Sequence, residues 1–171
     1  ETVTRYFEKV VVVLNVGGMV DTSWFVKEKK IPAVLLAWQG GMEGGLAAAE
    51  LLAGMGSPSG KLPDTFAARL EDYPSSYNFH ESDFYVDYTD DIYVGYRYFE
   101  TMPGALAKVN YPFGFGLSYT QFDWQVVSVS EKLGQLLVQV DLTNVGKRPG
   151  KEVLQVYGMA PQGKLGKSKR H

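Results

Sequence analysis

A glycine-rich stretch, Trp38-Gln-Gly-Gly-Met-Glu-Gly-Gly-Leu46, carries the side chains of this sequence that are best placed to meet a ligand. It lies between an apolar run and a run of helix-forming residues, so it is predicted to connect a strand to a helix. Glycines let the backbone approach a ligand closely, and backbone N–H groups and the positive end of the helix point into such a loop. Glu43 offers a carboxylate there and Trp38 an aromatic face, which makes both of them candidate substrate-binding residues.

Each of these two side chains also has a purely structural interpretation. Glu43, just ahead of a helix, would stabilise the helix dipole, and Trp38 would pack in the core. The sequence leaves both interpretations open.

Two buried strands are predicted to position this loop. Ile31–Ala37 is apolar without alternating polar residues, which is typical of a strand buried on both faces of a parallel sheet. Val10–Asn15 is a second such run, rich in β-branched residues. Between them, Asp21 or Thr22 can cap a short helix that runs to Lys29, which completes a strand-helix-strand crossover.

Helices are predicted on either side of the two strands. Glu1–Lys9 resembles the last turns of a helix, and Leu46–Ala53 is a run of strong helix formers that Gly54 ends. Strands that alternate with helices in this way imply an α/β architecture with a parallel sheet.

The regular alternation ends beyond Gly56. Asp64–Asp91 is dense in Pro, Ser, Tyr and Asp, and a segment of this length without regular structure is usually functional or packed on a neighbour. Within Asp90–Glu100, apolar and aromatic residues alternate with others. This alternation predicts a strand, with a short helix as the alternative, and its members are Ile92, Val94, Tyr96 and Tyr98.

The last third of the chain has an antiparallel all-β pattern. Phe122–Val129, Leu136–Thr143 and Glu152–Tyr157 alternate apolar and polar residues, with Gly, Asn and Pro between them. We therefore expect a domain boundary near 116–120, and three strands are too few for the sandwich that this pattern suggests. The basic tail Gly163–His171 is expected to be frayed or an expression scar.

Composition excludes several function classes. The 171 residues carry 17 basic and 19 acidic side chains, for a net charge of −2, so neither nucleic acid nor an anionic membrane is expected as a partner. The absence of cysteine excludes disulfides, thiol nucleophiles and zinc–thiolate sites. No stretch has the length of a transmembrane helix, and the opening residues do not resemble a signal peptide, so cytoplasmic, periplasmic and secreted locations all stay compatible.

Other catalytic motifs are missing. Gly41-Met-Glu-Gly-Gly lacks the spacing of a dinucleotide fingerprint, and Gly56-Ser-Pro-Ser-Gly-Lys-Leu lacks that of a phosphate loop. No Gly-x-Ser-x-Gly elbow occurs, and His80 and His171 are the only histidines, so neither a serine hydrolase nor a histidine metal site is predicted. We expect no metal and no cofactor.

Six motifs in order along the chain resemble the C-terminal half of family 3 glycoside hydrolases of the β-glucosidase and β-xylosidase type. The resemblance extends from Val10 to about residue 167. The motifs occupy residues 12–17, 37–45, 57–63, 91–99, 111–122 and 143–157, and they include Trp-Gln-Gly-Gly-Met-Glu-Gly-Gly, Val-Gly-Tyr-Arg-Tyr-Phe and Tyr-Pro-Phe-Gly-Phe-Gly-Leu-Ser-Tyr.

This resemblance implies a layout of a TIM-like barrel, an α/β sandwich and a fibronectin III-like domain. Residues 1–118 would then be the end portion of the parallel-sheet α/β sandwich with a loop-rich connector, and 119–171 the first strands of a truncated fibronectin III-like β-sandwich. The family's nucleophilic aspartate lies in the barrel, and its acid/base glutamate lies in a Gly-Glu-Gly type motif expected upstream of Glu1. Glu43 matches a glutamate that is common in the family's glycine loop, but no motif makes it the acid/base.

The resemblance therefore implies part of a retaining β-glycosidase, chiefly a β-glucosidase that hydrolyses terminal non-reducing β-D-glucosyl residues. A retaining mechanism needs two closely spaced carboxyl groups, and no pair in this sequence can be given the two roles. No catalytic residue is therefore assigned to this chain. The chain alone should be inactive. Its expected partners are the barrel domain, which could also be supplied by a separate chain, and a β-glucoside or related oligosaccharide. The alternative is a non-catalytic module that binds carbohydrate or protein through the aromatic stretch 73–98. Sugar and linkage preference and oligomeric state stay open.

Overall fold

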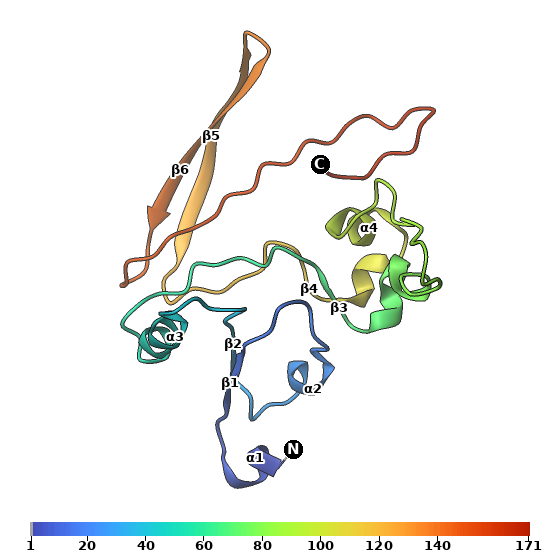
Figure 1. Cartoon of the computed structure of the whole chain (residues 1–171). Helices are drawn as coiled ribbons and strands as arrows, with labels where there is room; N and C mark the ends of the chain where they lie inside the picture. Colours follow the sequence, from blue (N-terminus) through green and yellow to red (C-terminus); the bar gives the residue numbers. More distant parts are fainter. Residues whose placement is uncertain (1) are drawn as a thin grey trace. The chain divides into compact units, whose positions relative to one another are not determined.

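The computed structural model describes residues 2–171 and divides them into two compact units (Figure 1). Unit 1 contains the described residues up to Gly45, together with Leu62–Phe115 and Gln155–His171. Unit 2 contains Leu46–Lys61 and Gly116–Leu154. Among the described residues, no helix has the length and apolar character that crossing a bilayer requires.

Unit 1 begins with the predicted strand-helix-strand crossover. Helix α1 (Thr2–Tyr6) leads into β1 (Val11–Leu14), and the short helix α2 (Ser23–Val26) connects β1 to β2 (Ala33–Leu36). The two strands pair in parallel, which confirms the α/β prediction for this segment (Figure 1). The β-branched run and the proline before β2 therefore encode the crossover as expected.

The prediction that both strands are buried on both faces is wrong: in β2 Ala33 is exposed and the other residues are only half-buried, and β1 departs further. Its residues alternate in exposure, and Val11 and Val13 are 51% and 42% exposed. An apolar run without polar alternation does not say what covers it. In the described part of the chain, the sheet has two strands, and the face that carries these two valines stays open.

The buried centre of unit 1 lies farther along the chain. Strand β3 (Phe66–Ala67) pairs antiparallel with β4 (Val109–Tyr111), and the cluster of Ala67, Phe99 and Ala105 is 2–6% exposed. Helix α4 (Tyr96–Thr101) contributes Phe99 and the 3₁₀ turn η3 (Ala105–Lys108) contributes Ala105. Tyr73, which lies between the 3₁₀ turns η1 (Leu70–Asp72) and η2 (Pro74–Tyr77), packs against the cluster.

Helix α4 corrects the prediction of a strand within Asp90–Glu100. Gly95 has φ +59°, a conformation that favours glycine, and the helix starts directly after it. The helix buries Phe99, whereas Ile92 and Val94 are 41% and 56% exposed. The alternation that suggested a strand therefore does not mark a buried face, and the short helix was the correct alternative.

The tail also differs from expectation, because it is tied to unit 1 rather than frayed. Ser168 is fully buried, and the Lys169 N–H donates to Thr101 Oγ1 at 2.8 Å. Gly158 and His171 exchange two backbone hydrogen bonds of 3.0 Å. Backbone bonds and side-chain contacts, rather than apolar content, fix this segment, which is why its composition did not reveal it.

Unit 2 contains the antiparallel hairpin of β5 (Phe122–Lys132) and β6 (Gln135–Asn144), drawn in Figure 1. Leu133 and Gly134 form its turn with φ values of +53° and +75°. The third predicted strand, Glu152–Tyr157, is not a strand, since no partner strand pairs with it among the described residues. A hairpin alone does not test the fibronectin III-like sandwich, which stays a prediction.

Helix α3 (Gly44–Leu52) ends as the sequence predicted. Gly54 has φ +72°, its N–H bonds the Leu51 carbonyl at 3.0 Å, and the Met55 N–H bonds the Glu50 carbonyl at 2.8 Å. This pair of bonds is the Schellman motif. The motif favours glycine at this position, because glycine adopts a positive φ without strain.

Candidate functional site

Trp38 lies directly beyond β2, at the carboxyl end of the parallel pair, and its backbone is in an unusual conformation. Its φ is +54°, which is an outlier for a bulky residue other than glycine. The half-buried indole packs against Phe66, with ring centroids 6.4 Å apart. Such strained positions persist only where the surroundings fix them, and they cluster at functional sites.

The glycines after Trp38 allow a close backbone approach. A Cβ on Gly40 would lie 2.9 Å from Gly44 Cα, and a Cβ on Gly17 would lie 2.9 Å from the side-chain nitrogen of Gln39. The loops after β1 and β2 are therefore in contact at the carboxyl edge of the sheet. Glu43 is exposed in the turn that precedes α3. The loop geometry is as predicted, and ligand binding by Trp38 and Glu43 stays a prediction.

A polar contact fixes the loop after β1. Thr22 is 2% exposed, and its hydroxyl accepts a 2.8 Å hydrogen bond from Asn110 Nδ2. The Asp21 carboxylate instead accepts from the Ser23 N–H at 2.8 Å. Hydrogen bonds from the Ser23 side chain and backbone lower the pKa of Asp21.

Tyr73 holds the segment that packs under Trp38. Its phenolic oxygen accepts a 2.8 Å hydrogen bond from the Ala67 N–H, and it lies 3.1 Å from the Thr65 carbonyl, to which it donates. Burial raises the pKa of Tyr73, so it stays a neutral donor at neutral pH. The phenol thus fixes the residues on both sides of Phe66.

A buried carboxylate lies in the same unit. Asp72 is 4% exposed, and its Oδ1 lies 3.4 Å from both Arg69 and Lys108 nitrogens. Burial alone would raise the pKa of Asp72, but hydrogen bonds and positive charge from Arg69 and Lys108 outweigh it and lower the pKa. This aspartate therefore stays ionised and paired at neutral pH.

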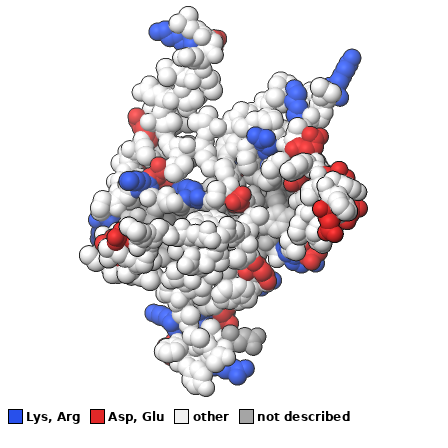
Figure 2. All heavy atoms as spheres, viewed as in Figure 1, with Lys and Arg blue, Asp and Glu red and all other residues white. Residues whose placement is uncertain are grey.

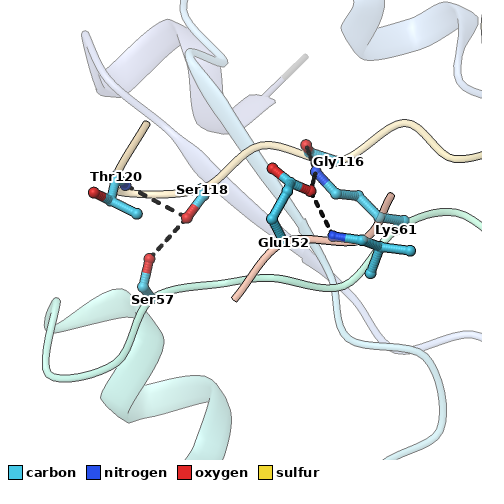
Figure 3. Close-up of polar contacts among 7 residues, drawn as sticks. Ser57, Lys61, Gly116, Ser118, Thr120 and Glu152 are labelled. Atoms are coloured by element: carbon cyan, nitrogen blue, oxygen red, sulfur yellow. Dashed lines mark hydrogen bonds and ion pairs between the residues drawn. The ribbon is translucent and has the colours of Figure 1, made fainter. Parts of the chain in front are cut away.

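Unit 2 contains a separate polar cluster, drawn in Figure 3. The Lys61 ammonium lies 2.8 Å from a Glu152 carboxylate oxygen and donates to the Gly116 carbonyl at 2.9 Å. Beside it, the Ser57 and Ser118 hydroxyls are 2.9 Å apart. The Thr120 N–H donates to the Ser118 hydroxyl at 3.4 Å. The cluster joins three segments that are far apart in the sequence.

Sequence reasoning missed the two ion-paired clusters for different reasons. Lys61 and Glu152 are 91 residues apart, so no local spacing announces their pairing. Arg69 and Asp72 are three residues apart, a separation that brings side chains together on a helical turn and could have been recognised.

These arrangements can supply hydrogen-bond acceptors and can hold the loops in place. In the described residues, no three His, Cys, Asp or Glu side chains come together as metal ligands. The carboxylates of Asp72 and Glu152 are each held by cations, which favours a fixed acceptor over a proton donor. Trp38 and Glu43 supply a half-buried indole and an exposed carboxylate on a strand-helix loop.

Comparison with known proteins gives consistent matches. The family model described as "Glycosyl hydrolase family 3 C-terminal domain" matches residues 1–119. "Beta-glucosidase A" of Butyrivibrio fibrisolvens is 61% identical over 96% of this chain and 22% of that protein. A "Beta-glucosidase" of Ruminococcus albus is 48% identical over 96% of this chain and 17% of that protein. The chain thus spans about a fifth of the length of these relatives.

Solved structures of β-glucosidases also match this chain. A β-glucosidase from Paenibacillus barengoltzii has a TM-score of 0.92 and 53% identity, over 99% of this chain and 19% of that one. β-Glucosidase 3B from Thermotoga neapolitana, solved in complex with glucose, has a TM-score of 0.83 and 41% identity, over 95% of this chain and 22% of that one.

Proposed function

The chain belongs to glycoside hydrolase family 3, and we propose that it forms part of a retaining β-glucosidase that hydrolyses terminal non-reducing β-D-glucosyl residues. The family resemblance carried by the six sequence motifs is confirmed. The observation that carries the proposed activity is the 61% identity to "Beta-glucosidase A" over nearly the whole chain.

We propose the domain boundary at residues 118 and 119. The parallel pair β1 and β2 supports an α/β sandwich domain on the N-terminal side, and the family model ends its match at residue 119. The β5–β6 hairpin supports a fibronectin III-like domain on the C-terminal side, because its two strands are antiparallel and their apolar and polar residues alternate.

The catalytic carboxyl groups are proposed to lie outside these 171 residues. Retention requires a nucleophile and an acid/base whose carboxyl groups are about 5 to 5.5 Å apart. The buried Asp72 and the half-buried Glu152 are both committed to cations, and Glu43 is exposed in a turn. The chain alone should therefore be inactive, and its partner would be the barrel domain that carries the nucleophile.

Trp38 and Glu43 are proposed to form one wall of the substrate cleft of the longer enzyme. They lie at the carboxyl end of parallel strands, the edge where α/β sheets usually bind ligands. The Trp38 indole would contact the sugar with the part of its ring that Phe66 does not cover. The Glu43 carboxylate would accept hydrogen bonds from sugar hydroxyls.

The experiment is an assay of a longer protein that contains this chain and a barrel domain. It should release 4-nitrophenol from 4-nitrophenyl β-D-glucoside, and proton NMR should show β-glucose as the first product. The α-glucoside serves as the control substrate and should not be cleaved. Absence of hydrolysis would refute the β-glucosidase proposal, and α-glucose as first product would refute retention.

A further inference from the structure

A pocket of about 480 Å³ opens in unit 1, among the short turns that follow β3. This volume is within the range of about 300–1,000 Å³ that is usual for small-molecule sites. The pocket takes residues from η1, η2, α4 and the end of η3. The polar and aromatic side chains of its lining on which the proposal rests are Asp72, Tyr73, Ser76, Tyr77, Tyr98 and Lys108.

Two of the three tyrosine rings are rigid. Tyr73 and Tyr98 pack edge-on against the buried Phe99, with centroid distances of 5.7 Å and 5.2 Å. Tyr77 is 72% exposed and offers a free ring. Tyr73 and Tyr98 thus form fixed walls of the pocket, and the exposed flat face of Tyr77 suits the apolar face of a sugar ring.

The charged groups at the pocket balance one another. Asp72 is paired with Lys108 and with Arg69, and the side chains of these cations are 49% and 71% exposed. Lys108, the cation that lines the pocket, therefore keeps donors free for a ligand. Glu71 also lines the pocket, and acidic side chains gather on the segment 71–91 in Figure 2. Glu71, Asp72 and Lys108 line the pocket, and Arg69, which is outside the lining, pairs with Asp72. With both cations counted the acids are balanced, which favours neither an anionic nor a cationic ligand.

We propose that this pocket is a non-catalytic site for a neutral saccharide. A sugar ring lies on Tyr77, and its hydroxyls accept hydrogen bonds from Lys108 and exchange them with Ser76. The buried Asp72 holds the lysine in position. The site is separate from the loop of Trp38 and Glu43 and does not depend on the proposed function.

The test is a calorimetric titration of the 171-residue chain with cellotetraose. A saturable signal is expected, and Tyr77→Ala should weaken the affinity about tenfold through loss of the stacking ring. Tyr77→Phe should keep it, and Lys108→Met should weaken it through loss of the donors. Tyr88→Ala is the matched control, because Tyr88 is 93% exposed and does not line the pocket. Circular dichroism checks that each variant folds.

The proposed saccharide site would be overturned if no saturable binding is seen, or if folded Tyr77→Ala binds as tightly as the unmodified chain. Loss of binding in Trp38→Ala with full binding in Tyr77→Ala would place the sugar at the loop after β2 and also overturn it. Neither result bears on hydrolysis by the longer protein, so the two proposals can fail separately.

Discussion

The ammonium group of Lys61 lies 2.8 Å from the carboxylate of Glu152, and the two side chains are only 16% and 19% exposed. The same ammonium group bonds the Gly116 carbonyl at 2.9 Å (Figure 3). Because the pair is shielded from water, loss of one partner leaves a poorly solvated charge, which costs more than the loss of an ion pair on an open surface.

Lys61→Met should therefore lower the free energy of unfolding by about 1–3 kcal/mol, because Glu152 loses its counter-charge. Urea unfolding followed by circular dichroism measures this change. Lys132→Met is the control, since Lys132 is exposed at the end of β5, and it should change stability little. Equal stability of both variants would contradict a contribution from the ion pair.

Stability should depend on pH through Glu152. Its pKa lies below the ordinary value of 4.5, chiefly because Lys61 donates a hydrogen bond to it and the Val153 N–H donates another. A lowered pKa in the folded state stabilises the fold above the ordinary value, and this contribution is lost as the pH falls through the lowered pKa.

Urea midpoints measured from neutral to acidic pH test this expectation. The unmodified chain should lose more stability on acidification than Glu152→Gln. Asp72, whose pKa is also lowered, contributes equally to both proteins. Parallel curves for the two proteins would show that Glu152 does not contribute.

Gly116→Ala should destabilise unit 2. A Cβ at this position would overlap the Gly60 carbonyl oxygen and lie 3.0 Å from Lys61 Cδ. Overpacking against backbone costs about 1–3 kcal/mol, which a lower thermal midpoint would reveal. Gly60→Ala is a close control, because a Cβ on Gly60 meets nothing within 4 Å. A thermal midpoint of Gly116→Ala no lower than that of Gly60→Ala would contradict the close approach.

Local patterns predicted the elements whose determinants are adjacent in sequence. The crossover, the C-terminus of α3 at Gly54 and the β5–β6 hairpin all follow from runs, glycines and alternation. Patterns failed where distant contacts decide. Burial of Phe99 packs α4 against the core, although the alternation at Ile92 and Val94 suggests a strand. Glu152 pairs with Lys61 in a segment where a third strand was expected.

The candidate site was predicted in part. The glycine loop and its position after β2 follow from the sequence, whereas the positive φ of Trp38 and its contact with Phe66 do not. Backbone strain of this kind depends on the surroundings that hold the residue, and no spacing in the sequence encodes it.

Glu43→Gln in the longer protein tests the proposed cleft wall. Loss of a charged acceptor for a sugar hydroxyl should lower kcat/KM for 4-nitrophenyl β-D-glucoside about tenfold or more. The thermal midpoint should not change, since Glu43 is exposed. Glu50→Gln on α3, also exposed, is the control. An unchanged kcat/KM would contradict the proposed contact between Glu43 and the sugar.

Hydrolysis of 4-nitrophenyl β-D-glucoside by the purified 171-residue chain alone is the most direct test of the account, which assigns these residues to the supporting part of a β-glucosidase. We predict no release of 4-nitrophenol above that of buffer, and release when the same residues are present within a protein that also contains the barrel. Turnover by the isolated chain that persists after contaminating enzyme has been excluded would contradict the account.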